Sequence, residues 1–333
     1  MEQQHMFTNR MIRNLLVPVV LEQILNSIMG TADTMMVSNV GSAALSAVSL
    51  VDSINVLLIQ AFSALAAGGA IVCAQYIGQR NYEKANMSAR QVLFIITAIS
   101  VVVSAVCLIF QKPLLRLIFG AVDADVMRAS ETYFFFTALS FPFIAAYDSA
   151  ASIFRAQENT KGPMTISMIS NIMNIGGNAV LIWVFHLGVA GAAISTLVSR
   201  IFCAVVVLWQ LRKDRQPVVV RDYLKIRPDW SMIGRILGLG IPSGIENSMF
   251  QLGKLAIQST VSTLGTAAIA AQAMTNILEN LNGIAAIGVG VGLMTIVGQC
   301  LGAGRKDEAV YYIKKLCVIA EVVIIVSCLI VYI

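Results

Sequence analysis

The segment AQYIGQRNYEKA (residues 74–85) is followed 224 residues later by GQCLGAGRKDEA (298–309). The correspondence extends upstream without a gap, and 15 of 68 aligned residues are identical between 18–85 and 242–309. The identities include polar residues, prolines and glycines, which an apolar composition does not explain: Pro18/Pro242, Glu22/Glu246, Ser38/Ser262, Gly41/Gly265, Gly68/Gly292, Gln75/Gln299 and Gly78/Gly302. An internal repeat of this kind in an apolar chain is typical of membrane transporters built from two copies of one helical bundle.

The composition predicts an all-α integral membrane protein. Apolar residues make up 57% of the chain and charged residues 12%, with a mean hydropathy of +0.78, whereas soluble domains carry about 25% charged residues. A helix needs about 20 mostly apolar residues to cross a hydrocarbon core of ~30 Å. Apolar runs of this length are expected to be helices, because only helices and closed barrels satisfy their backbone groups in lipid. Nine segments qualify: 12–38, 46–73, 91–111, 130–154, 163–185, 187–211, 232–262, 267–298 and 312–333.

The basic residues are distributed unevenly between the two ends of these segments. Eighteen of the 23 lysines and arginines fall in the N-terminus and in the loops at 79–90, 155–162, 212–235 and 303–315. The opposite side receives Lys112, Arg116 and Arg128. The positive-inside rule therefore predicts a multi-pass protein of the cell membrane with a cytoplasmic N-terminus. This basic rim also accounts for the net charge of +5, so no nucleic-acid partner is expected.

The repeat divides the sequence into three parts. Residues 1–211 are predicted to form a first lobe of six spans, and 212–231 a polar cytoplasmic linker between lobes. Residues 232–333 are predicted to form the first three spans of a second lobe. Because six is an even number, both copies enter the membrane in the same orientation, which makes the repeat parallel. The apolar run AEVVIIVSCLIVYI reaches Ile333. We therefore expect two six-helix lobes with the second lobe only half present, and three further spans in the natural protein.

Cysteine and histidine patterns argue against an enzyme. The six cysteines lie in or beside the apolar segments without paired spacing, which favours packing residues over ligands or disulfides. His5 and His186 lie outside the segments, and the sequence has no HExxH motif, which excludes the usual zinc intramembrane protease. The sequence therefore predicts neither catalysis nor a prosthetic cofactor.

Polar residues inside the apolar segments are the candidate functional residues, because a charge at the bilayer centre costs about 3 kcal/mol or more. A carboxyl group there can exchange a proton or accept a cation. For the asparagines of these segments, the alternative is interhelical hydrogen bonding. Pro18 removes a backbone hydrogen bond and is expected to kink the first span. The residues assigned to substrate binding or gating are Pro18, Glu22, Pro242, Glu246 and Glu279.

Several segments resemble the multidrug and toxic-compound extrusion (MATE) transporters. GTADTMMVSNVGSAALSAVSL (30–50) resembles the first-span signature of that family, with Asp33 fifteen residues after Pro18. The other matching blocks follow in the family's order: AQYIGQRNYEKA (74–85), IFRAQENTKGPM (153–164), SNIMNIGGN (170–178), GVAGAAIST (188–196) and GQCLGAGRKDEA (298–309). Each motif alone is weakly specific, but the ordered set on a repeated bundle is strong, and it covers the whole chain.

The resemblance implies twelve spans in two lobes that alternate between outward and inward openings. It also implies export of amphipathic, often cationic compounds, driven by a gradient of protons or sodium ions. In many members the coupling site joins a first-span aspartate, two residues of span five and a threonine of span six. Carried over by motif, these positions are Asp33, Asn174, Asn178 and Thr196, which would also hold Na⁺ if sodium is the coupling ion.

Two positions depart from the family pattern. Asn178 stands where many members carry an aspartate, so the site keeps an oxygen ligand and loses one negative charge. One group of members carries a glutamate eight residues after the span-seven proline; that position is Phe250 here, and the acid is Glu246, one turn closer to Pro242. Because affinity for hard cations rises with ligand charge, a site whose only carboxylate is Asp33 favours the proton over sodium.

Two other classes stay open at this point. A lipid-linked oligosaccharide flippase of the same superfamily would be expected to line its cavity with several basic residues, yet only Arg200 and Lys254 lie within the spans. A membrane-bound enzyme or receptor is disfavoured by the duplicated bundle and by the missing catalytic pairs. The predicted partners are therefore small amphipathic or cationic substrates and membrane lipids, and the predicted state is a monomer.

Overall fold

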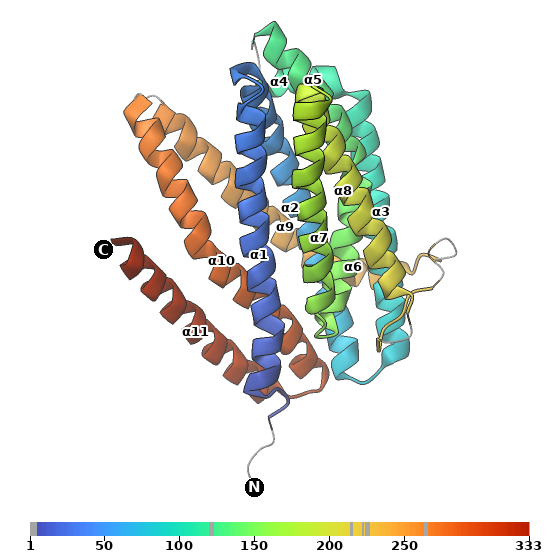
Figure 1. Ribbon diagram of the computed structural model, residues 1–333. Coiled ribbons are helices and arrows are strands. Elements are labelled where there is room, and N and C mark those ends of the chain that lie inside the picture. Colours follow the sequence, from blue (N-terminus) through green and yellow to red (C-terminus); the bar gives the residue numbers. More distant parts are fainter. Residues whose placement is uncertain are drawn as a thin grey trace.

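The computed structural model describes residues 5–119, 123–213, 216–221, 223, 227–262 and 266–332. All regular secondary structure in these ranges is helical (Figure 1). The helices are α1 (Asn9–Ser38), α2 (Ser42–Gly78), α3 (Tyr82–Ile109), α4 (Gln111–Phe119), α5 (Ala124–Leu139), α6 (Phe141–Ala156), α7 (Lys161–Ala179) with the π-helical turn η1 (Val180–Val184), α8 (Gly188–Leu211), α9 (Trp230–Ser262), α10 (Thr266–Gly302) and α11 (Lys306–Tyr332).

Within the described residues, six helical segments are long and apolar enough to cross a membrane. They are Asn9–Ser38, Ser42–Gly78, Tyr82–Ile109, Lys161–Val184, Gly188–Leu211 and Leu278–Gly302. The pair α5 and α6 is a seventh if it is taken as one span. The other two predicted segments lie on α9 and α11, which have 33 and 27 residues. The prediction of an all-α, multi-span membrane protein is confirmed.

The predicted continuous span 130–154 is broken in the structure. α5 ends at Leu139, α6 begins at Phe141, and the two helices are bent by 42°. The physical reason is Pro142 in the first turn of α6, since proline has no N–H to continue the hydrogen bonds of α5. Arg200 of α8 donates from Nη1 to Ser140 Oγ at the break, over 2.7 Å.

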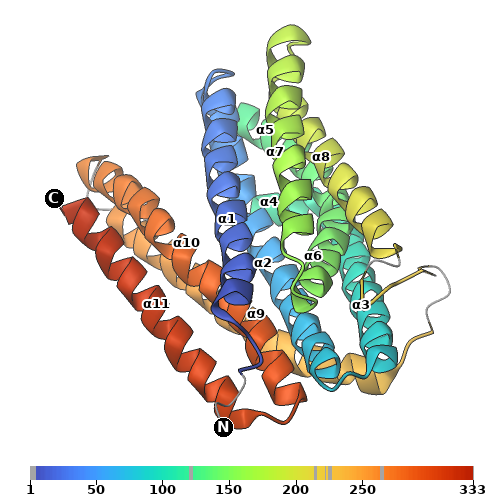
Figure 2. The same cartoon turned by 60° about the horizontal axis from the view of Figure 1, so that its bottom comes forward.

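α1 is one helix that runs through Pro18, which is buried. The kink expected at this proline stays a prediction. The same helix packs against α7 on one side and against α10 on the other (Figures 1 and 2). α1 therefore joins the helices that come before the 212–231 segment to those that follow it.

The ends of the bundle differ in charge. α1 begins, α2 ends, α3 begins, α10 ends and α11 begins at one end of the molecule (Figure 1). We call it the basic end, because its segments 5–13, 79–84 and 303–306 carry Arg10, Arg13, Arg80, Lys84, Arg305 and Lys306. The ribbons of α9, α10 and α11 converge with α1 and α2 at this end and diverge from them toward the other end (Figures 1 and 2).

The N-terminal segment is fixed to α11 at the basic end. The Tyr312 hydroxyl accepts from Phe7 N at 2.9 Å and donates to Phe7 O at 2.8 Å. Both side chains are buried, and their rings lie edge to face. Met6 N also donates to Glu308 Oε2, at 3.0 Å. A chain start held in this way keeps α1 in register against α10 and α11.

Candidate functional site

Three of the predicted coupling residues surround Asp33. Asn178 Nδ2 of α7 donates to Asp33 Oδ1 of α1 at 2.6 Å. Asn174 lies one turn before Asn178 on the same face of α7, and Thr196 of α8 lies 3.3 Å from its amide. Both asparagines are buried, whereas Asp33 and Thr196 are half-buried. The structure therefore brings Asp33, Asn174, Asn178 and Thr196 together, as the motif resemblance implied.

The close approach of α7 and α8 explains why this cluster forms. A Cβ at Gly177 would lie 3.3 Å from Ser195 Cβ and would overlap Ser195 Oγ, so a larger residue there would displace the Ser195 hydroxyl. Ser195 Oγ donates to Asn174 O at 2.8 Å, and Ser199 O accepts from Ser170 Oγ at 3.1 Å. These bonds fix the rotation of α7, which directs the two asparagines at α1.

The Asn174 amide lies between Asp33 and Thr196. With its nitrogen toward Asp33, it donates to Asp33 Oδ1 at 2.9 Å and Oδ2 at 3.2 Å, and its oxygen accepts from Thr196 Oγ1 at 3.3 Å. An ionised carboxylate only accepts hydrogen bonds, whereas a protonated one also donates. The amide donors of Asn174 and Asn178 therefore suit an ionised Asp33.

The cluster also has an oxygen that a cation could use. Asn178 Oδ1 is buried and has no hydrogen-bond partner among the described residues. Together with the carboxylate of Asp33, the hydroxyl of Thr196 and the amide oxygen of Asn174, it offers the oxygen ligands that hard cations prefer. The residues present thus fit either a proton on Asp33 or a small hard cation.

A second carboxylate, Asp52, lies on α2. Asp52 Oδ1 accepts from Tyr133 of α5 and from Asn55, both at 3.2 Å. Tyr133 and Asn55 are buried and Asp52 is half-buried. Asp52 therefore links α2 to α5, the helix that ends just before the break at Ser140.

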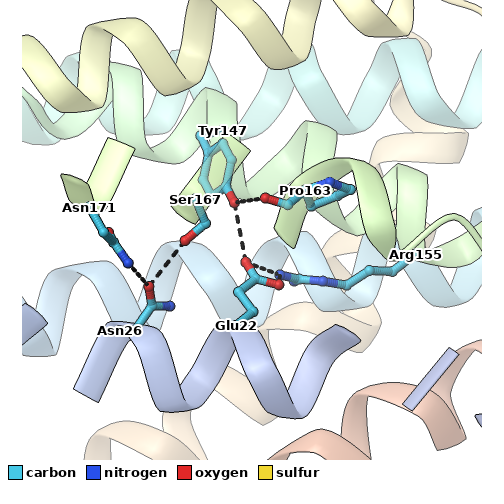
Figure 3. A network of polar contacts seen from close by, with 7 residues as sticks. All are labelled: Glu22, Asn26, Tyr147, Arg155, Pro163, Ser167 and Asn171. Carbon is cyan, nitrogen blue, oxygen red and sulfur yellow. Dashed lines mark hydrogen bonds and ion pairs between the residues drawn. The ribbon is translucent and has the colours of Figure 1, made fainter. Parts of the chain in front are cut away.

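Glu22 is the centre of a third network, which Figure 3 shows. Arg155 Nη2 at the end of α6 donates to both carboxylate oxygens of Glu22, each at 3.1 Å. The Tyr147 hydroxyl lies 3.2 Å from two acceptors, Glu22 Oε1 and Pro163 O. The Glu22 residue is 2% exposed, and the Arg155 side chain is 18% exposed. This is a buried ion pair that ties α1 to α6 and α7.

The location of the Arg155 side chain differs from the one that the sequence predicted. Arg155 belongs to the basic loop 155–162, which was expected to face the cytoplasm, yet its guanidinium points inward to Glu22 (Figure 3). The physical reason is that a buried carboxylate needs a charged or hydrogen-bonding partner. The signal that could have identified Arg155 is its position directly after an apolar run, in a chain with an acid in span one.

One turn further along α1, Asn26 continues the same network. Its Oδ1 accepts from Ser167 Oγ at 3.1 Å and from Asn171 Nδ2 at 3.0 Å (Figure 3). Glu22, Asn26 and Asp33 thus form a ladder of polar residues along the face of α1 that meets α7. Here the interhelical role that the sequence left open for asparagines is observed directly.

The predicted residues of the second repeat lie elsewhere. Pro242 and Glu246 of α9 are exposed, and Glu246 does not join the Asp33 cluster. Glu279 of α10 pairs with Lys254 of α9, Nζ to Oε1, at 2.8 Å. Glu22 and Glu246 occupy equivalent repeat positions but different surroundings, one buried with Arg155 and the other exposed.

Comparison with known proteins gives one family. The model of the MatE family matches residues 18–180 and 242–333. The probable multidrug resistance protein YoeA of Bacillus subtilis is 28% identical over 302 residues, which is 88% of this chain and 64% of the relative. The probable multidrug resistance protein NorM of Thermotoga maritima is 25% identical over 308 residues, 90% of this chain and 65% of the relative. The chain thus spans 64–65% of the length of these relatives.

A solved structure shares the fold. It is a multidrug resistance MATE family transporter of the MOP superfamily in an outward-facing conformation. The TM-score is 0.88 at 20% identity, with 94% of this chain and 69% of that chain covered. The helical arrangement described above is therefore that of a known transporter fold.

Proposed function

The chain belongs to the MatE family, and from this premise we propose that it is part of an antiporter that exports amphipathic or cationic compounds in exchange for a cation. The proposal concerns transport and not catalysis, because the members of this family are transporters. The relatives named above are multidrug resistance proteins, which supports a small-molecule substrate. Membrane lipids are the other expected partner, and a monomer is the expected state.

The observation that carries the proposal is the Asp33 cluster. A half-buried carboxylate with two amide side chains within hydrogen-bond distance can bind either a proton or a cation. The net charge of the site is then different with and without the bound ion. Asp33 lies on α1, which contacts α7 at Asp33 and contacts α10 further along, at Leu16 and Val20. A change in the charge of Asp33 therefore acts on the α1–α7 contact directly and on the second repeat through α1. That is what coupling an ion to a conformational change requires.

Two asparagines of α7 are the hydrogen-bond partners of Asp33. When Asp33 is ionised, the amide nitrogens of Asn174 and Asn178 both donate to it. A protonated carboxyl group gains a donor and loses part of its capacity to accept. Protonation of Asp33 therefore changes the hydrogen bonds that join α1 to α7.

A pKa difference between two conformations and the membrane potential together supply enough free energy for this coupling. A difference of one unit in the pKa of a carboxyl group between two conformations is about 1.36 kcal/mol. One charge moved through ~100 mV adds about 2.3 kcal/mol. Together they shift a two-state equilibrium by a factor of roughly 10²–10³, which supports alternating access driven by one residue.

The proposed architecture follows the repeat. Residues 1–211 form the first lobe, 212–231 the linker and 232–333 the first three helices of the second lobe. The basic end faces the cytoplasm of the cell membrane under the positive-inside rule. In support, α8 ends at Leu211 and α9 begins at Trp230.

The flippase alternative is not favoured. Its substrate carries a pyrophosphate, which calls for several cations facing one cavity. In the described residues, Arg155 is paired with Glu22 and Lys254 with Glu279, and Arg200 donates to Ser140. The relatives are also named for multidrug resistance.

The test is transport by the complete protein in vesicles. A cationic amphipathic dye is followed while a pH gradient or a sodium gradient is imposed separately. We expect movement of dye under the pH gradient at constant sodium. Movement driven by sodium alone would overturn the choice of ion and keep the antiporter, and no gradient-driven movement would overturn the transport function.

A further inference from the structure

α2 and α10 meet at the basic end without side chains between their backbones. A Cβ built at Gly78, the last residue of α2, would lie 2.8 Å from the carbonyl carbon of Gln299 and would overlap its oxygen. A Cβ at Gly302, the last residue of α10, would lie 2.7 Å from the carbonyl carbon of Gln75 and would overlap that oxygen. Each helix thus places a glycine on the backbone of the other.

The two contacts are equivalent in the repeat. Gln75 and Gly78 correspond to Gln299 and Gly302, each 224 residues apart. The crossing is therefore reciprocal: the glycine of one copy packs on the glutamine of the other. Adjacent to it, a Cβ at Gly298 would lie 2.9 Å from Ala74 Cβ, which extends the close approach by one turn.

A second pair of contacts repeats in the same way further from the basic end. A Cβ at Gly68 of α2 would lie 2.6 Å from Gly240 N of α9. Its repeat equivalent, Gly292 of α10, packs on Leu15 and Leu16 of α1, and a Cβ there would lie 2.9 Å from Leu15 Cδ2. Leu16 and Gly240 are themselves 224 residues apart. The four helices α1, α2, α9 and α10 therefore meet through two matched sets of contacts.

Side chains of α10 also close this junction against α6. Thr295 Oγ1 donates to Arg155 O at 3.1 Å, and Gln299 Nε2 donates to Ala156 O at 2.9 Å. Both carbonyls belong to the last turn of α6, where backbone acceptors have no partner within the helix. These bonds join the two repeats and involve the residue that also holds Glu22.

Neither Gly78 nor Gly302 is required by backbone conformation. Both are helical, and neither has a positive φ. In such positions alanine is intrinsically more favourable than glycine, because it loses less conformational entropy on folding. Among the described residues, the steric reason for glycine at these two positions is the backbone of the opposing helix. That reason holds only while α2 and α10 are in contact.

We propose that Gly78 and Gly302 form a gate at the basic end, closed in this structure, whose separation is the switch to the opposite opening. This inference rests on the proposed alternating-access function. A backbone contact without side chains parts without breaking an ion pair or leaving a charge unpaired, so it can open and close repeatedly. At the other end, α9, α10 and α11 already diverge from α1 (Figure 2).

The test is a methyl group placed in the contact. Gly78→Ala and Gly302→Ala are made singly in the complete protein. The reporter is Thr295→Cys, in a background in which the six native cysteines are alanine. Thr295 is 3% exposed between α10 and α6, so a membrane-impermeant maleimide added at the basic end labels it only when the gate opens. Overpacking a close contact is costly, and we expect each substitution to raise the labelling rate about tenfold or more.

Matched controls separate gating from general damage. Gly234→Ala on α9 and Gly290→Ala on α10 add the same methyl where nothing lies within 4 Å, and labelling should stay at the parent rate. Ser104→Cys reports on unfolding, because Ser104 is buried and donates to Ala138 O, away from the gate. It should stay unlabelled in every variant.

The outcomes are distinct. Increased labelling of Thr295→Cys alone supports the gate. Labelling of both reporters, or of neither, in the Gly78 and Gly302 variants would show a packing contact with no gating role. If the parent transports dye and the glycine variants change nothing, the gate is wrong and the proposed function stands. If the variants shift labelling and the parent moves no dye, the gate stands and the transport function fails.

Discussion

Arg155 Nη2 lies 3.1 Å from both carboxylate oxygens of Glu22, and this buried pair connects α6 to α1 (Figure 3). The backbone oxygen of Arg155 accepts from Thr295 of α10. One residue at the end of α6 thus contacts α1 through its side chain and α10 through its main chain. The ion pair therefore holds α1 against α6, next to the place where α6 contacts α10 of the second repeat.

Removing one member of this pair should be strongly destabilising. Arg155→Met leaves the Glu22 carboxylate buried without its cation, and we expect the free energy of unfolding to fall by about 3–5 kcal/mol. The double variant Glu22→Gln/Arg155→Met should lose less than the sum of the single losses, because it leaves no unpaired charge. The measurement is equilibrium unfolding of the purified protein in detergent micelles.

The control for this cycle is a more exposed pair. Lys112 Nζ and Glu131 Oε2 lie 4.0 Å apart, and their side chains are 70% and 27% exposed. Lys112→Met should change stability by less than about 1 kcal/mol, as exposed pairs do. Equal small losses for Arg155→Met and Lys112→Met would show that the buried pair contributes no more than an exposed one.

The sequence predicted the helices well because the signal for them is local. A run of apolar residues long enough to cross a bilayer is helical in lipid wherever it occurs, and each of the nine predicted segments falls largely on helix in the described residues. The break at Ser140 was missed, because Pro142 lies inside an apolar run that reads as continuous. Proline interrupts a helix because it has no backbone N–H to donate, and a hydropathy scale does not record this.

The candidate site was predicted in part. Motif resemblance assigned Asp33, Asn174, Asn178 and Thr196, and the structure brings them together. It did not reveal the partners of Glu22, since Arg155 is 133 residues away in sequence. Nor did it separate Glu22 from Glu246: the repeat makes the two positions equivalent, and only tertiary contacts decide which acid is buried.

Pro18→Ala tests whether α1 changes shape during transport. Pro18 is buried within α1 and lies one turn before Glu22. If a kink at Pro18 is part of switching, alanine restores the missing backbone hydrogen bond and should slow turnover more than it weakens substrate binding. Turnover and dye affinity are measured on the same reconstituted protein. A weaker affinity with unchanged turnover would place Pro18 in a binding pocket and not in a hinge.

Asp33→Asn tests the coupling carboxylate itself. The amide cannot lose a proton or carry a charge, so we expect gradient-driven efflux to fall to background. Expression and folding should be nearly intact, because an amide can still accept from Asn178. Glu131→Gln is the control, since Glu131 pairs with Lys112 outside the cluster. Normal efflux by Asp33→Asn at normal membrane levels would remove Asp33 from the coupling role.

Asn178→Asp tests what the missing acid does to ion choice. Asn178 Nδ2 donates to Asp33 Oδ1 at 2.6 Å, so an aspartate there replaces a donor with a second carboxylate at the same distance. Two such groups repel unless a cation or a proton lies between them. Since affinity for hard cations rises with ligand charge, we expect sodium to stimulate efflux by the variant more than efflux by the parent. The measurement is dye efflux at fixed pH with sodium added or withheld, and Asn171→Asp, which lies outside the Asp33 cluster, is the control. If sodium strongly stimulates the parent protein and a pH gradient does nothing, the single carboxylate already suffices for sodium and the preference for protons is wrong.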